Sequence, residues 1–164
     1  MSSSDRRTLL TLLAALPLAA CGFAPAYGPG GAAGRLRGRV AVTAPTDRNG
    51  FELLRQLEQR LGMPEAPLFD LSTSVSAGTV SGGITPDNAI TRYQLRGSAV
   101  WSLSQRSDGA RVAGGTARGF TSWSATGSTI AGLAAEEDAA RRLMVILADQ
   151  IVTQIIAKAP DIAP

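Results

Sequence analysis

The single cysteine of this 164-residue chain, Cys21, ends the sequence LAAC. A leucine three positions before a cysteine, with small residues between them, is the bacterial lipobox. The thiol receives a diacylglyceryl group, and the signal peptidase then needs small residues beside the lipidated sulfur. Upstream, Arg6 and Arg7 precede an apolar run over residues 8–18 that is too short to span a bilayer permanently. We therefore expect residues 1–20 to be a lipoprotein signal peptide and Cys21 to be the lipidation site.

The residue after the cysteine is Gly22 and not aspartate, a pattern typical of lipoproteins sorted to the outer membrane. We expect the mature protein on the periplasmic face of that membrane, held by its N-terminal lipid. The Arg6-Arg7 pair leaves two export routes open, the twin-arginine route and ordinary secretion. The companion residues of a twin-arginine signal are missing, which favours ordinary secretion.

Chemistry beyond lipidation has little support in the residue types. The sequence has no histidine and no second cysteine, which excludes a Ser-His-Asp or Cys-His catalytic group, a His/Cys zinc site and an internal disulfide. Its glycine clusters lack the lysine and the strand–loop–helix setting of a nucleotide site. Glu136, Glu137 and Asp138 are adjacent near the beginning of a predicted helix, where they complement its dipole but cannot converge as an acid–base pair. We expect no enzyme activity, no metal and no cofactor.

Charge and composition indicate one exported domain. Lys and Arg together number 16 and Asp and Glu 13, so the formal net charge is +3. The basic residues are spread along the chain without a concentrated stripe or interleaved aromatics, so we expect no nucleic-acid binding. With 45% hydrophobic and 18% charged residues, the chain resembles neither a disordered protein nor a multi-span membrane protein.

The first half of the mature chain predicts a tether, a strand and a helix. Residues 21–36 are rich in Gly, Pro and Ala and are expected to form a lipidated tether. Alternating valines after residue 37 predict a short strand that ends at Pro45. Thr46 and Asp47 are candidate N-caps for a helix that stops at Gly62. Its apolar stripe is expected at Phe51, Leu54, Leu57 and Leu61.

The second half predicts three strands and a long helix. The strands are expected over residues 69–77, 92–103 and 111–122, with a loop at 78–88 and a hairpin turn at Ser107-Asp108-Gly109. Gly114, Gly115 and Gly119 in the last strand indicate bulges or a close neighbour. The helix is expected to reach residue 157 and to be closed by Pro160, followed by a tail at 159–164. Its apolar face is expected at Leu143, Leu147, Ile151 and Ile155.

This order of elements predicts an α+β fold with a single domain over residues 37–158. Two helices would pack on one face of a four-stranded mixed sheet, in the order β-α-β-β-β-α, as a two-layer sandwich. The strand–helix–strand start predicts that the first two strands are parallel. The other face of the sheet is expected to be open and to carry polar groups and arginines.

Four stretches of the chain resemble the LptE lipopolysaccharide-assembly lipoprotein family, and they occur in the same order. They are the start CGFAPAYG, the segment RVAVTAPTDRNGFELLRQLEQRLG, the strand TRYQL and the late helix LAAEEDAARRLMVILADQI. The resemblance implies two helices on a four-stranded sheet. It also implies a lipoprotein of the outer membrane that plugs the lumen of a large β-barrel, LptD, assists the barrel's assembly and binds lipopolysaccharide.

The basic residues that this resemblance links to lipopolysaccharide are absent from the matching positions. The loop before the TRYQL strand reads SGGIT and the start of the last helix reads AAEE, neither with a base. The nearest substitutes are Arg92, Arg96 and Arg118, whose planar guanidinium groups suit the phosphates of lipid A. Solvated strand charges or contacts to the barrel wall are the alternative interpretation of these arginines.

A second function class pairs a lipobox with a small α/β domain as well. It is the auxiliary lipoprotein of a phospholipid-transport ABC system. The CGF start and the R-x-Y-Q-L strand favour the lipopolysaccharide-assembly family over it.

Overall fold

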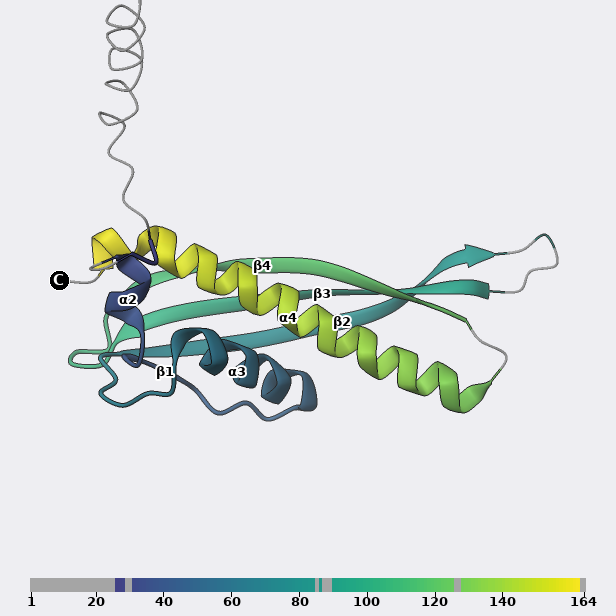
Figure 1. Cartoon of the computed structure of the whole chain (residues 1–164), viewed down its shortest axis with the longest axis horizontal. Coiled ribbons are helices and arrows are strands. Elements are labelled where there is room, and N and C mark those ends of the chain that lie inside the picture. The colour runs from purple at the N-terminus through teal and green to yellow at the C-terminus, as the bar shows by residue number, and fades with distance from the viewer. Residues whose placement is uncertain (1–25, 29–30, 85, 87–89, 126–127, 163–164) are drawn as a thin grey trace, which may run out of the picture.

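Figure 1 shows the computed structural model of the chain, which describes residues 26–28, 31–84, 86, 90–125 and 128–162. The expected signal peptide and Cys21 lie outside the described residues. The predicted α+β fold with the order β-α-β-β-β-α is confirmed, and one further short helix precedes it. The elements are α2 (Ala32–Leu36), β1 (Val40–Val42), α3 (Arg48–Leu61), β2 (Phe69–Ile84), β3 (Ile90–Gln105), β4 (Arg111–Ser124) and α4 (Thr129–Ile162).

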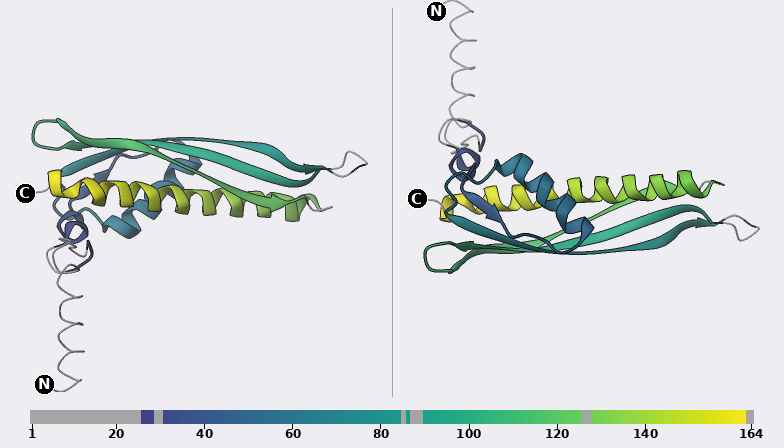
Figure 2. Two further views of the ribbon diagram at one scale, coloured as in Figure 1. Left: turned by 90° about the horizontal axis from the view of Figure 1, so that it is seen from above. Right: turned by 90° about the horizontal axis from the view of Figure 1, so that it is seen from below.

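The strands form one mixed sheet in the order β1-β2-β3-β4. As predicted, β1 is parallel to β2, while the other two pairs are antiparallel. Helices α3 and α4 both lie on one face of the sheet, which gives the expected two layers (Figure 2). The predicted hairpin turn joins β3 to β4, where Gly109 supplies the positive φ of 72°.

Helix α3 begins and ends as predicted, but its buried stripe is rotated. The Asp47 side chain accepts a 2.7 Å hydrogen bond from the Gly50 N–H, and Gly62 follows the last turn at a φ of 82°. The buried leucines, however, are Leu53, Leu57 and Leu61. Leu54 is only half-buried, and Phe51 is 54% exposed. At about 100° per residue, Phe51 lies roughly 120° around the helix from Leu57, so both cannot face the sheet.

Part of the segment expected to be a loop, residues 78–88, is instead regular strand. Strand β2 continues through the predicted loop to Ile84, because Thr79 pairs with Leu95 and Ser81 with Tyr93 in a long ladder with β3. The main-chain bonds of that ladder do not depend on the small side chains that suggested a loop.

The packed domain also extends past its expected limits at both ends. Residues 32–36 of the expected tether form α2, and its Leu36 is fully buried in the core. Helix α4 does not end at Pro160 but runs to Ile162, which packs against the same core. Packing at both ends therefore outweighs the local helix-breaking and tether signals.

Helix α4 packs closely on the sheet with the predicted face. Leu143, Leu147, Ile151 and Ile155 all have 0% exposure. Beneath them the sheet presents glycines: a Cβ added to Gly119 would lie 2.9 Å from Ile146 Cγ2, and one added to Gly97 would lie 2.8 Å from Leu143 Cδ2. The close neighbour expected at Gly119 is therefore α4 itself.

Side chains of α4 also cap the outer edge of β4. They stand four or eight residues apart along the helix, and each bonds a main-chain group of β4. Arg142 donates to the Ser122 carbonyl, Gln150 binds both the N–H and the carbonyl of Arg118, Gln154 donates to the Thr116 carbonyl, and Lys158 donates to the Gly114 carbonyl. This edge of the sheet is thereby closed to further strands.

Replacing Gly119 with valine should separate α4 from the sheet. The new side chain would overlap Ile146, and overpacking of this kind costs about 1–3 kcal/mol of unfolding free energy. Gly78→Val is the matched control, since a Cβ there has no neighbour within 4 Å. Urea unfolding followed by circular dichroism measures both variants. Equal midpoints for Gly119→Val and wild type would contradict this packing.

Candidate functional site

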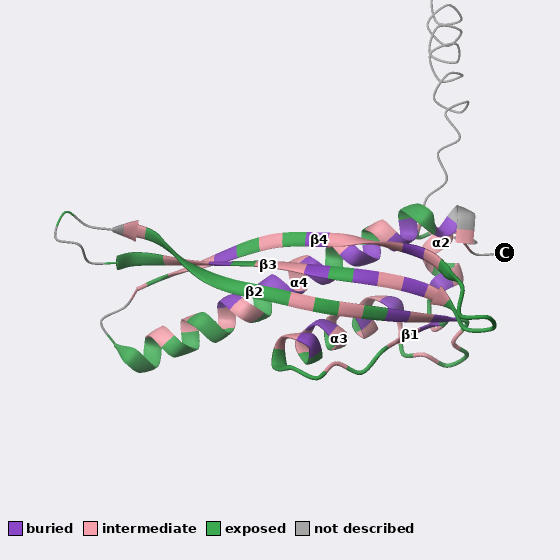
Figure 3. Ribbon diagram, turned by 180° about the vertical axis from the view of Figure 1, so that it is seen from behind, coloured by how far each residue is buried: buried purple, intermediate pink, exposed green. Residues whose placement is uncertain are grey.

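One face of the sheet carries none of the helices that the structure describes, and we call it the outer face. In the regular part of the ladder, even-numbered residues of β2, β3 and β4 point to it, because the odd-numbered partners Leu71, Leu103 and Ala113 face the helices. Val112, beside the register shift at the start of β4, packs against the core instead. Figure 3, the view onto this face, shows buried and exposed positions alternating along the strands. The outer face is built mainly from Ser, Thr, Gly, Gln and Arg, as the sequence predicted.

All three predicted site arginines lie on the outer face. Arg92 and Arg96 stand on β3, four residues apart, which is about 13 Å along a strand. Arg118 lies on β4 opposite Ser98, so it is a diagonal neighbour of Arg96. Each of the three is exposed. The structure thus brings Arg96 and Arg118 together and leaves Arg92 nearer the far end of the sheet.

These arginines differ from those of the helices in what they bind. The arginines of α3 and α4 pair with carboxylates: Arg48 with Glu137, Arg55 with Glu52, Arg60 with Asp149, and Arg141 and Arg142 with Asp138. Within the described ranges, none of the three outer-face guanidinium groups pairs with a carboxylate. Arg96 Nε donates to Gln94 Oε1 at 2.7 Å instead. Their positive charge therefore remains available to an external anion.

Apolar side chains stand among these charges. Phe120 lies directly opposite Arg96 and is 62% exposed. Val100 on β3 and Val80 on β2 are 55% and 42% exposed. A surface that combines unpaired guanidinium groups with exposed apolar side chains suits an amphiphile with phosphate groups better than a purely polar ligand.

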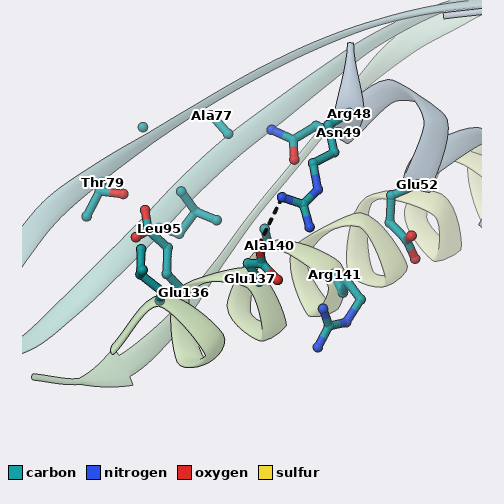
Figure 4. Close-up of a pocket in the computed structure, with 12 residues that line it drawn as sticks. Arg48, Asn49, Glu52, Ala77, Thr79, Leu95, Glu136, Glu137, Ala140 and Arg141 are labelled. Carbon is teal, nitrogen blue, oxygen red and sulfur yellow. Dashed lines mark hydrogen bonds and ion pairs between the residues drawn. The ribbon is translucent and has the colours of Figure 1, made fainter. Parts of the chain in front are cut away.

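A cleft of about 490 Å³ lies on the opposite, helix-bearing side (Figure 4). It is bounded by the start of α3, the first half of α4 and the inner side of β2 near Ala77 and Thr79. Leu95, Leu133 and Ala140 supply apolar surface. The charged residues of its lining are Arg48, Glu52, Glu136, Glu137 and Arg141. This cleft could not be predicted from the sequence, because no local pattern tells how the first turns of α4 sit against β2.

Of the three adjacent acidic residues of α4, Glu136, Glu137 and Asp138, one forms an ion pair with α3. Arg48 Nη1 donates to Glu137 Oε1 at 3.0 Å. This hydrogen bond, together with the attraction between the charges, lowers the pKa of Glu137. Glu136 also lines the cleft, whereas Asp138 does not and binds Arg141 and Arg142. The predicted effect on the helix dipole is wrong, because α4 begins at Thr129 and the first turn contains no acidic residue.

Neither surface has the donors of a metal centre. Among the described residues, no group of three or more carboxylate, cysteine or histidine ligands could hold a metal ion. Among the same residues, no helix is both long and apolar enough to cross a membrane.

A family model described as LptE, lipopolysaccharide-assembly, matches residues 38–155, from just before β1 to the last turns of α4. The chain belongs to the LptE family. The family resemblance seen in the sequence is thereby confirmed. The chain is therefore a lipopolysaccharide-assembly lipoprotein. No curated protein matches the sequence significantly.

Solved structures share the LptE fold with this chain. A candidate lipoprotein from Caulobacter crescentus CB15 superposes with a TM-score of 0.68 at 24% identity, covering 81% of this chain and 98% of its own. Rare lipoprotein B from Shewanella oneidensis gives 0.59 at 13% identity, with 75% and 96% covered. A minor lipoprotein from Acinetobacter baumannii gives 0.54 at 19% identity, with 73% and 89% covered. At these identities the likeness establishes the fold alone.

Replacing Arg48 with glutamine should raise the pKa of Glu137 toward the ordinary carboxyl range, because the hydrogen bond and the nearby positive charge are both lost. With a lowered pKa in the folded state, the wild-type contact stabilises the fold above the ordinary carboxyl pKa. That contribution is lost as the pH falls through the lowered value.

NMR titration of the Glu137 carboxyl carbon measures this change in wild type and R48Q. Glu52 is the internal reference, since the hydrogen bond from Arg55 is the main cause of its lowered pKa. An identical Glu137 titration in both proteins would rule out the contact with Arg48.

Proposed function

We propose that this chain is the lipoprotein subunit of an outer-membrane lipopolysaccharide translocon. It occupies the lumen of an LptD-type β-barrel as a non-catalytic plug and assists assembly of the barrel, so that lipopolysaccharide reaches the cell surface. The observation that carries the proposal is the family match over residues 38–155 on a fold that leaves one sheet face open. That face is rich in Ser, Thr and Gly, which suits the polar, water-containing lumen of a large barrel.

The N-terminal sequence supplies the anchor in this proposal. After removal of residues 1–20, acyl chains on Cys21 would hold the domain at the periplasmic face of the outer membrane. The Gly- and Pro-rich residues that follow would link the lipid to the domain, which is packed from α2 onward. Two or three acyl chains, at about 0.8 kcal/mol per buried methylene, are enough for stable anchoring.

A pull-down from detergent-solubilised outer membranes tests this function. A C-terminally tagged full-length chain is expected to recover one large β-barrel protein in near-equal amount, identified by mass spectrometry. The same spectra should show acylated Cys21 as the N-terminal residue. Recovery of an inner-membrane transporter or its periplasmic partners would move the function to phospholipid transport. Recovery of the tagged chain alone would contradict both functions.

We further propose Arg96 and Arg118, with Arg92, as contacts for lipid A phosphates. Their support is the lack of carboxylate partners among the described residues and the apolar neighbours Phe120 and Val100. Charge-assisted hydrogen bonds to phosphate contribute about 1.5–3 kcal/mol each, so one lost contact is about a tenfold or greater loss of affinity.

The double variant Arg96→Gln/Arg118→Gln should therefore bind purified lipopolysaccharide at least about tenfold more weakly than wild type. Arg106→Gln is the single-charge control, because Arg106 lies beside the hairpin turn and pairs with Asp70 at 3.7 Å. Binding measured by surface plasmon resonance at constant salt gives both values. If Arg106→Gln loses as much affinity per charge removed as the double variant, the loss of lipopolysaccharide binding comes from net charge and not from the outer-face site.

A further inference from the structure

Among the described residues, most of β2 has no neighbouring strand on one side. Strand β1 pairs only with Phe69–Leu71, and the last contact is the bond from the Thr43 N–H to the Leu71 carbonyl, 2.9 Å long. Main-chain groups of alternate residues point to the same side of a strand. The odd-numbered residues from Thr73 to Ser81 therefore present their N–H and carbonyl groups to this side. We call residues 73–81 the free edge.

These main-chain groups have no partner within the part of the chain that the structure describes. The contrast with the opposite edge is sharp, since four side chains of α4 bind the equivalent groups of β4. Because the β4 edge is capped, a further strand could pair with this sheet only at the free edge of β2.

The free edge also lacks the features that normally prevent strand pairing. Residues 71–83 contain neither a charged residue nor a proline. The irregularity of β2 lies at its far end, between Ser81 and Ile84, and leaves residues 73–79 in unbroken register with β3. An edge this regular and neutral is a ready template for another strand.

The cleft lies directly beside the middle of the free edge. The side chains of Ala77 and Thr79 face the helix layer and line the cleft together with Leu95 and Leu133, yet both are exposed. Residues opposite Ala77 and Thr79 on an added strand would share that face of the sheet. Their side chains would enter the cleft of about 490 Å³.

We propose that the free edge accepts an extended segment of the barrel partner as a fifth strand of the sheet, with apolar side chains at alternate positions seated in the cleft. This inference rests on the function proposed above. The free edge spans nine residues, or about 30 Å, long enough for main-chain hydrogen bonds to hold such a segment. A second copy of this chain fits less well, because its own Ala77 and Thr79 are too small to fill the cleft.

The variant Ala77→Pro removes the N–H at the centre of the free edge. That N–H points away from β3, so the β2–β3 ladder is kept. The matched control is Ala77→Ser, which retains the N–H and the side-chain size. In pull-downs of the full-length chain, A77P is expected to recover about tenfold less barrel than wild type, and A77S the same amount.

Hydrogen exchange on the wild-type chain tests the same inference without a variant. The amides of Val75, Ala77 and Thr79 are expected to exchange at least about tenfold more slowly in the barrel complex than in the free chain. The Arg118 amide, already bound by Gln150, should keep its rate. Because no substitution is involved, this measurement tests strand addition at the free edge even if A77P does not fold.

The outcomes separate failure of the edge from failure of the function. If wild type recovers the barrel but the three amides keep their rates, strand addition is overturned and the plug function stands. If wild type recovers no barrel, the function fails and the occupant proposed here fails with it. If the free chain sediments as a dimer that A77P dissociates, the edge belongs to a second copy and the proposal is overturned.

Discussion

The attachment of α4 along β4 is the contact on which the rest of this structure depends. Glycines in the sheet let the helix approach closely, and side chains four residues apart bind the outward main-chain groups of the edge strand. Among these, Gln154 also accepts the Trp101 indole N–H at 2.8 Å, which joins the edge to the core. One helix thus closes the core, covers one sheet face and caps one edge.

The same arrangement makes the molecule asymmetric in charge and in hydrogen bonding. The helix layer neutralises its arginines internally, as in the Arg48–Glu137 and Arg142–Asp138 pairs. The outer face keeps Arg92, Arg96 and Arg118 without carboxylate partners among the described residues. Among the described residues, guanidinium groups without carboxylate partners therefore lie on the outer face, and main-chain groups without hydrogen-bond partners lie along the free edge. In the function proposed above, the outer face would meet the anionic lipid and the free edge would meet the barrel partner.

Much of the fold could be predicted from the sequence because its signals are local. Alternation in β3, the Asp47 cap, the turn at Gly109 and the i, i+4 series from Leu143 to Ile155 depend on neighbouring residues. The predictions failed where tertiary contacts decide: the stripe of α3, the extension of β2 through a Gly- and Ser-rich stretch, and the helix past Pro160. The outer-face location of the arginines followed from strand alternation. The cleft and the free edge did not, because they depend on how α4 and the short β1 are placed relative to β2.

A cryo-electron microscopy structure of the complex isolated from outer membranes tests the central claim most directly. We expect this domain inside the lumen of a large β-barrel. Its outer face, with Arg96 and Arg118, should be turned to the water-containing space of the lumen, and the free edge of β2 should be paired with a segment of the barrel protein. Density that places the domain outside the barrel, or inside it with residues 73–81 unpaired, would contradict the plug or the strand pairing respectively.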